Sequence, residues 1–408
     1  MTVAGMNRSP DRGSAASDQR AAFAAGYLGW TLDALDYFLV VFCLTAIGRE
    51  FHQSDAAMAL SLTVTLAFRP VGAFIFGLLA DRYGRRLPFI LDLIFYSVAE
   101  MLSGLAPNYA SFMVLRALFG IGMGGQWGVG STLAMEKVPP RLRGVLSGLL
   151  QQGYATGNLL AAGCYFFLFD RLGWRPLFFI GGIPALLLAF FVQYRVKESE
   201  VWQKTRHDSW GHLFRGILSY WKLFLFLVAL MTCMNFVSHG TQDMYPTFLQ
   251  RQWNFSAKAR AAMTAVSAVG AIVGGTLFGL YSDRSGRRRA MITALLLAVV
   301  VTPVWVFAPS TGLLVVGAFL MQFMVQGAWG VIPAHLAELS PDAVRGFLPG
   351  FGYQCGVLIA GSVAYIEAVF AAHTSYSVAM AATAVTVFIL AAIAVAFSHE
   401  RRAAHFGV

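Results

Sequence analysis

The chain has 408 residues, with 30 lysines and arginines against 20 aspartates and glutamates, and a formal net charge of +10. Hydrophobic residues make up 57%, charged residues 12%, and the mean hydropathy is +0.63, which excludes an ordinary soluble domain. The charge does not indicate nucleic-acid binding, because 22 of the 30 basic residues lie in the segments expected on the cytoplasmic side of a membrane protein.

Residues 1–20 are polar and rich in Ser, Ala and Arg, so we expect a disordered cytoplasmic tail rather than a cleavable signal. Twelve apolar segments follow, and each approaches or exceeds the about 20 residues that cross a bilayer. Because backbone groups in lipid must be satisfied within the segment, all are predicted to be helices. The segments lie near 22–47, 57–80, 87–105, 108–134, 142–169, 174–196, 219–249, 258–281, 289–308, 311–337, 344–371 and 374–397.

The chain repeats itself at an offset of 202 residues, since Gly77–Arg86 returns as Gly279–Arg288. The register then holds without a gap for the pairs Trp127 and Trp329, Glu136 and Glu338, Arg143 and Arg345, and Gln152 and Gln354. We therefore predict an all-α membrane protein with twelve transmembrane helices in two six-helix pseudo-symmetric bundles. The bundles are 21–196 and 219–398, joined by a cytoplasmic linker at 197–218 and followed by a cytoplasmic tail at 399–408.

The repeated loop Asp81-Arg82-Tyr83-Gly84-Arg85-Arg86 follows the second helix of its half. Gly84 suits a tight turn, and Asp81 can meet cations or a helix N-terminus only when the cytoplasmic side is closed. The alternative is a solvated basic loop that only fixes topology, but two copies in register favour a gate. The expected gate residues are Asp81, Arg85, Arg86, Glu136 and Arg143, with Asp283, Arg287, Arg288, Glu338 and Arg345.

The repeated Gly-x-Leu-x-Asp-Arg-x-Gly-Arg-Arg resembles the signature loop of the major facilitator superfamily, over residues 20–398. The run from Arg116 through Gly120, Gly122 and Gly124 resembles the fourth-helix motif of that family, although glycines in this pattern equally serve close helix packing. The resemblance implies a transporter that works by alternating access. The sequence has no nucleophile–base motif, metal-ligand spacing or nucleotide loop, so we expect no enzyme.

Ionisable residues inside a membrane cost about 2.5–3.5 kcal/mol on insertion scales, so each one marks a candidate site. Arg69 lies twelve residues before Asp81, about 18 Å into the second span at 1.5 Å per residue, and would attract an anion. Asp33 and Asp36 share one face of the first span. Asp92, Glu100 and Glu367 are discounted, because an acid near a helix end can reach headgroup water or an internal partner.

The seventh span carries the densest polar cluster, in which five side chains fall within an arc of about 140° and are expected to face the bundle interior. Pro246 cannot donate to the carbonyl of Gln242, and Gly240 makes local unwinding easy. Taken singly, its members can be explained as hydrogen-bonding partners of a neighbouring helix. The five are Asn235, Ser238, His239, Gln242 and Asp243.

The pattern Asn-x-x-Ser-His-x-x-Gln-Asp-x-x-Pro-Thr at 235–247 resembles the seventh-helix signature of the Jen-type lactate and pyruvate permeases, in the sialate and lactate proton-symporter group. Arg69 and Gln354 are similar to functional positions of that family, whereas Val357 stands where the fungal proteins have Asn. The resemblance implies proton-coupled monocarboxylate transport. Asp33 and Asp36 also resemble a pair in aromatic-acid proton symporters, so that pair does not separate substrate classes.

We therefore expect symport of a small monocarboxylate, such as lactate or pyruvate, with one proton. The alternatives are uptake of a larger acid, sialate or an aromatic carboxylate, and a non-transporting membrane sensor or structural protein. No cofactor, metal or nucleic acid is expected besides the coupling proton, and the chain is expected to work as a monomer in the lipid bilayer of a bacterial inner membrane, with both termini cytoplasmic. Substrate binding is assigned to Arg69, Asn235, Ser238, His239, Gln242 and Gln354, and proton coupling to Asp243, Asp33 or Asp36.

Overall fold

The computed structural model describes residues 12–207 and 209–407, which form helices and short loops and contain no strand within those ranges. The helices of the first half are α1 Arg12–Glu50, α2 Asp55–Tyr83, α3 Arg86–Gly104, α4 Tyr109–Lys137, η1 Pro140–Leu142, α5 Arg143–Gln151, α6 Gly153–Leu172 and α7 Trp174–Arg195. Two short helices, α8 Glu200–Thr205 and α9 Trp210–Ser219, lie in the predicted linker.

The second half follows the same order of long helices. Its predicted seventh and eleventh spans are each divided into two helices, after Gln242 and after Ala360. The elements are α10 Trp221–Gln242, α11 Tyr245–Arg251, α12 Ala257–Ser285, α13 Arg287–Val306, α14 Thr311–Leu339, η2 Asp342–Val344, α15 Leu348–Ala360, α16 Val363–His373 and α17 Tyr376–Phe397. Proline at the start of α11 explains the first of these breaks, because it has no N–H for the preceding turn.

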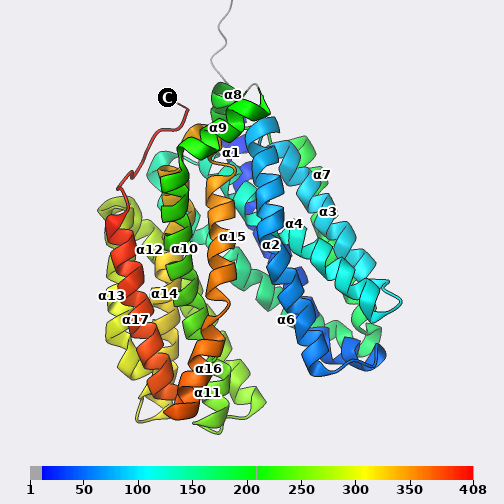
Figure 1. The fold of residues 1–408 in the computed structure, drawn as a ribbon, viewed down its shortest axis with the longest axis vertical. Coiled ribbons are helices and arrows are strands. Elements are labelled where there is room, and N and C mark those ends of the chain that lie inside the picture. Colours follow the sequence, from blue (N-terminus) through cyan, green and yellow to red (C-terminus); the bar gives the residue numbers. More distant parts are fainter. Residues whose placement is uncertain (1–11, 208, 408) are drawn as a thin grey trace, which may run out of the picture.

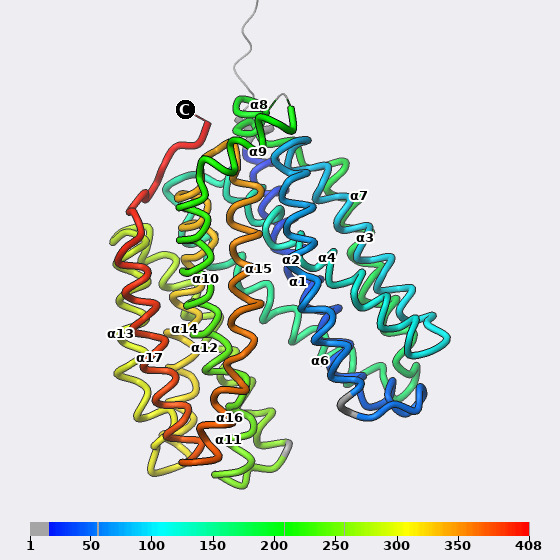
Figure 2. The backbone as a smooth tube through the Cα atoms, viewed as in Figure 1, coloured from blue at the N-terminus to red at the C-terminus, as the bar shows by residue number. Residues whose placement is uncertain are grey.

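The long helices stand in two groups side by side, with α2, α3, α4, α6 and α7 in one group and α10 to α17 in the other (Figure 1). The groups lie close together at the end that carries α8 and α9, which we call the linker end, and their ribbons diverge toward the opposite end (Figure 1). At the contact between the groups, α15 packs against α2 and α4, while α12 and α14 pack against α5 (Figure 2). Residues on α2 and α15 are therefore neighbours although they are far apart in sequence.

The fourth-helix glycines serve close packing. A Cβ atom on Gly120 or Gly124 would lie 2.2 or 1.9 Å from the carbonyl oxygen of Thr65 or Arg69, respectively, so any larger residue would push α4 away from α2. This contact holds the backbone of Arg69 firmly against α4.

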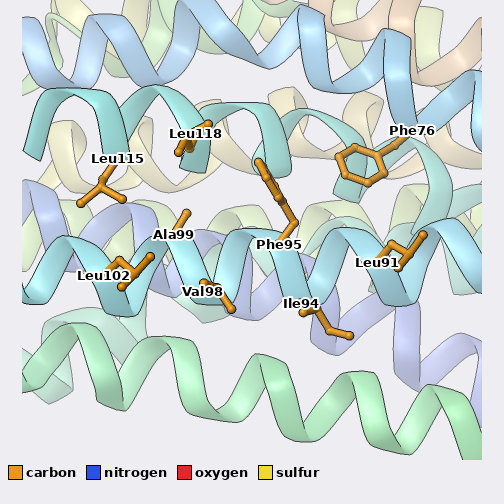
Figure 3. A pocket seen from close by; sticks show the side chains of 9 residues that line it. All are labelled: Phe76, Leu91, Ile94, Phe95, Val98, Ala99, Leu102, Leu115 and Leu118. Atoms are coloured by element: carbon orange, nitrogen blue, oxygen red, sulfur yellow. The ribbon is translucent and has the colours of Figure 1, made fainter. Parts of the chain in front are cut away.

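Much of the outer surface is apolar, as expected for contact with lipid. One hollow of about 460 Å³ lies on the outside of α2, α3 and α4 and is lined only by hydrophobic side chains (Figure 3). It offers no polar group to a charged substrate, so it is not the candidate transport site. Its lining residues are Phe76, Leu91, Ile94, Phe95, Val98, Ala99, Leu102, Leu115 and Leu118.

Ten spans among the described residues are long and apolar enough to cross a membrane. The predicted spans at 108–134 and 142–169 form α4 and the α5–α6 pair, but they are not among these ten. Both carry buried polar side chains that face other helices, including Arg116 and Gln126 on α4 and Gln151 on α5, which lowers their mean hydropathy. The predicted tail at 1–20 is corrected in part, because α1 begins at Arg12, while residues 1–11 lie outside the described part of the chain.

Candidate functional site

Arg69 is held in the interior, on α2, with only 4% of its surface exposed. Its Nε and Nη2 atoms are buried and have no hydrogen-bond partner among the described residues. Its guanidinium carbon lies 5.9 Å from the ring centre of Tyr353, which belongs to α15 of the other half. A buried cation with unused donors is costly unless something binds it, so Arg69 is the strongest candidate for an anion ligand site.

Gln354, which the sequence assigns to substrate binding together with Arg69, lies in the same region. Its Nε2 atom is 3.5 Å from the carbonyl oxygen of Gly124, the glycine that packs against Arg69, and its Oε1 atom is buried without a partner among the described residues. The structure therefore brings Arg69 and Gln354 to the same turn of α4, from opposite halves.

Aromatic side chains surround this region, and sequence reasoning did not assign them. The ring of Trp127 on α4 lies 4.5 Å from that of Tyr353, tilted by 42°, and Trp329 approaches the same ring at 5.9 Å, so the repeated tryptophan pair meets at one tyrosine. On the α1 and α6 side, Tyr154 lies 5.3 Å from both Trp30 and Phe38. The repeated pair Trp127 and Trp329 was the sequence signal that pointed to this aromatic region.

Asp33 and Asp36 on α1 are fully buried, and their carboxylate oxygens have no hydrogen-bond partner among the described residues. Asp33 is within electrostatic range of Arg69, and Asp36 is within range of Glu100 and Arg116. An ionised carboxylate without a partner is very unfavourable in such an interior. Both acids are therefore suited to taking up a proton.

The three discounted acids were expected to reach headgroup water or an internal partner; all three are buried, and Glu100 has an internal partner. Glu100 accepts a hydrogen bond from Arg116 at 2.6 Å, and both side chains are buried. Asp92 and Glu367 are also buried, and their carboxylate oxygens have no partner among the described residues. Distance from a helix end was a poor guide, because neighbouring helices cover these positions.

The polar residues of α10 do not all converge on one point. Asn235 is buried and donates to the carbonyl of Met231 in its own helix at 2.7 Å. Gln242 donates to Ser238 at 3.2 Å and to Gln322 of α14 at 2.9 Å. Two of these bonds lie within α10, and only the bond from Gln242 to Gln322 reaches another helix.

His239 and Asp243 form a separate pair, one turn apart. The Nδ1 atom of His239 lies 3.1 Å from Oδ2 of Asp243, and their side chains are 35% and 38% exposed. Tyr37 of α1 is within electrostatic range of both Asp243 and Arg69. One phenol of the first half is therefore within electrostatic range of both charged groups.

The predicted gate residues meet at the linker end. Asp81 accepts hydrogen bonds from the backbone N–H groups of Gly346 at 2.7 Å and Phe347 at 2.9 Å, and pairs with Arg85 at 2.5 Å. In the repeat, Asp283 accepts from Gly144 at 2.8 Å and Val145 at 2.9 Å, and pairs with Arg287 at 2.7 Å. Each loop acid thus binds the start of a helix in the opposite half, where the helix dipole favours negative charge.

Two glutamates complete the linker-end network, and both join the halves. Glu136 lies 3.1 Å from Arg85 and 3.5 Å from Arg345 of the second half. Glu338 lies 3.0 Å from Arg287 and 3.1 Å from Arg143 of the first half. This is the closed arrangement that the repeated loop predicts.

Arg86 and Arg288 do not join these pairs, which corrects their assignment to the gate. Their side chains donate to the carbonyls of Gln193 and Ala396, within their own halves. Sequence reasoning instead missed Glu198 and Glu400. Glu198 accepts from the backbone N–H of Arg85 at 2.8 Å and Glu400 from that of Arg287 at 3.0 Å, and the shared offset of 202 residues could have found them.

Comparison with known families agrees with this arrangement. The Major Facilitator Superfamily model matches residues 26–254, more than half of the chain. The chain belongs to the major facilitator superfamily. The model of the sugar (and other) transporter family matches residues 213–400 of the same major facilitator protein. Membership confirms the expectation of a multi-pass membrane transporter rather than an enzyme.

Among curated relatives, this major facilitator protein is 30% identical over 85% of its length to a carboxylic acid transporter protein homolog of Saccharomyces cerevisiae, and it spans 60% of the yeast protein. It is 27% identical to the sialic acid transporter NanX of Escherichia coli, covering 83% of this chain and 84% of that one. The solved proton:xylose symporter XylE superposes with a TM-score of 0.80 at 18% identity, over 96% of this chain and 98% of that one, which establishes the fold alone.

Proposed function

We propose that this protein transports a small monocarboxylate, such as lactate or pyruvate, together with one proton. The observation that carries the proposal is the buried Arg69 guanidinium, whose Nε and Nη2 donors have no partner among the described residues. A carboxylate is the natural partner of such a group, because two parallel N–H donors match its two oxygens. The relatives named for carboxylic acid and sialic acid transport support an acid as substrate.

The proposal includes the finer architecture expected from the sequence. It has twelve transmembrane helices in two six-helix bundles, with α4 and the α5–α6 pair spanning the membrane in spite of their polar, inward-facing residues. It also places the chain in the Jen-type group, on the pattern at residues 235–247. The chain would act as a monomer in a bacterial inner membrane, with both termini in the cytoplasm.

In this mechanism the substrate carboxylate binds Arg69. The amide of Gln354 and the phenol of Tyr353 then hold the remainder of a small acid. Rings around the site exclude water and so strengthen the pairing of opposite charges. Gln242, Ser238 and Asn235 contribute hydrogen bonds from α10, where the Asn235 amide donates to the Met231 carbonyl of the same helix and Gln242 donates to Ser238.

Proton coupling in this mechanism is a competition for Arg69. When Asp33 is ionised, it neutralises the nearby arginine and the substrate has no free cation to bind. When Asp33 or its neighbour Asp36 takes up a proton, Arg69 is released for the substrate anion, so proton and substrate favour each other. Asp243, paired with His239, is the alternative proton carrier, because Tyr37 is within electrostatic range of both Asp243 and Arg69.

Uptake of radiolabelled lactate into proteoliposomes tests the proposal. An inward proton gradient should drive accumulation, and a protonophore should abolish it while leaving exchange of internal for external substrate intact. Accumulation that ignores the proton gradient, or that depends on sodium alone, contradicts symport. The absence of any uptake or exchange of an acid would instead support the alternative of a sensor without transport.

The aromatic side chains favour a second candidate, a planar unsaturated or aromatic acid. Tyr353 is within reach of Arg69 and its ring contacts that of Trp127, so a flat substrate held by its carboxylate would lie against rings. Competition of lactate uptake by pyruvate, benzoate and sialate at several pH values separates these cases. Stronger inhibition by benzoate than by pyruvate would favour an aromatic acid as the substrate. Stronger inhibition by sialate than by pyruvate would favour the larger acid.

A further inference from the structure

The segment at residues 401–407, after α17, lies on the gate at the linker end rather than away from the molecule. The side chain of Phe406 lies between two arginines of opposite halves. The guanidinium carbon of Arg143 is 3.8 Å from the centre of its ring and that of Arg345 is 3.7 Å from it. Both distances are well within the range of a cation–π contact.

The backbone of the same segment enters the ion pair that joins the halves. Arg143 donates to the carbonyl of Ala404 at 2.8 Å, and the N–H of Ala403 donates to Glu338 at 3.2 Å. Arg143 and Glu338 are themselves paired at 3.1 Å, so the segment shares both partners of that pair.

Two further contacts fix the far end of the segment. The N–H of Gly407 donates to Asp342 of η2 at 2.7 Å, and its carbonyl accepts from Lys204 of α8 at 3.2 Å. The segment therefore touches the first half, the second half and the linker at once. No assigned gate residue lies within it.

We propose that residues 401–407 are a latch that holds the linker end closed and must release Arg143 of the first half before the halves separate there. The segment is joined to the second half through α17, whereas Arg143 belongs to the first half. Separation of the halves breaks the Arg143–Ala404 bond and removes one of the two guanidinium groups from Phe406. A cavity of about 280 Å³ is lined in part by Phe406 and Gly407, so there is open space beside the segment.

The latch is independent of which substrate is carried, so its test needs none. In a variant in which Cys43, Cys164, Cys233 and Cys355 are replaced by Ala, Thr132→Cys provides the reporter. Thr132 on α4 is 2% exposed and donates to the carbonyl of Arg345 across the gate, so it reacts with a water-soluble maleimide only when the linker end opens. The labelling rate then measures the population of the open form.

Phe406→Ala should raise the labelling rate roughly tenfold, because the cation–π contact between Phe406 and Arg143 of the opposite half, which only the closed form makes, is lost. A stop after Glu400 should raise it at least as much. Phe406→Tyr, which keeps the ring, should label at the parent rate, and so should the control Arg401→Ala, an exposed position of the same segment.

An unchanged rate in both Phe406→Ala and the shortened chain overturns the proposal. A second reporter distinguishes unfolding from opening of the linker end. It is a variant in which Cys43 is kept as the only cysteine. Cys43 is fully buried in α1, so it should stay unlabelled in the latch variants. If Cys43 reacts as fast as Thr132→Cys, the effect is loss of structure and the latch is rejected.

Discussion

The Oδ1 atom of Asp81 lies 2.7 Å from the backbone nitrogen of Gly346, although 265 residues separate the two in the chain. Asp283 and Gly144 repeat the relationship in the opposite direction at 2.8 Å. Each carboxylate also holds an arginine of its own loop, so one acid joins a local ion pair to the helix start of the other half. Separation of the halves at the linker end breaks both arrangements together.

Loss of the negative charge of Asp81 or Asp283 should open the linker end. Asp81→Asn keeps the shape but weakens hydrogen bonds that are worth about 1.5–3 kcal/mol when one partner is charged. We expect labelling of the Thr132→Cys reporter to rise by roughly tenfold or more, and Asp283→Asn to act in the same direction. Asp170→Asn, at an exposed position, is the matched control. Equal labelling of both loop variants and the control would show that these bonds do not hold the gate.

Replacement of Arg69 should abolish or strongly weaken substrate binding. Arg69→Ala removes a charge-assisted pair and should lower affinity by roughly tenfold to a hundredfold, while Arg69→Lys keeps the charge but loses the planar fork and should fall between. Binding of radiolabelled lactate to purified protein measures the effect, with the exposed Arg49→Lys as control. Unchanged affinity in correctly folded Arg69→Ala would rule out this anion site.

The proton carrier can be assigned by separating exchange from accumulation. Asparagine mimics a protonated aspartate, so a variant of the carrier should still exchange substrate but lose accumulation driven by the proton gradient. We expect this of Asp243→Asn, and we expect His239→Ala to weaken binding without abolishing coupling. If Asp33→Asn or Asp36→Asn loses accumulation while Asp243→Asn retains it, the coupling site is on α1.

The buried Glu100–Arg116 pair makes a prediction about stability. Removal of one partner leaves an unpaired charge in the interior, so Glu100→Gln or Arg116→Met should each lower the free energy of unfolding by about 3–5 kcal/mol. The double variant should be less destabilised than the sum of the two, because no isolated charge remains. Thermal unfolding in detergent checks this. Strictly additive losses would mean that the two side chains do not stabilise each other.

Much of the fold could be read from the sequence because lipid imposes a simple rule. Apolar runs long enough to cross a bilayer must be helical, and the predicted segments match the helices from α1 to α17 in order. The repeat was equally informative at the linker end. Residues in equivalent positions of two similar halves make equivalent contacts. Asp81 binds Gly346 and Asp283 binds Gly144, and these two glycines are themselves related by the repeat.

The side-chain contacts in the interior could be seen only in the tertiary structure, because they depend on how the helices pack. Arg69 meets Tyr353 only because α15 packs on α2, and Glu100 meets Arg116 only because α3 packs on α4. A hydrophobic run specifies that a helix crosses the membrane but not which face it turns to which neighbour, since lipid and helix surfaces are similarly apolar. Phe406 likewise looks like an ordinary residue of a polar tail. Its place between two arginines was decided by how the halves close around it.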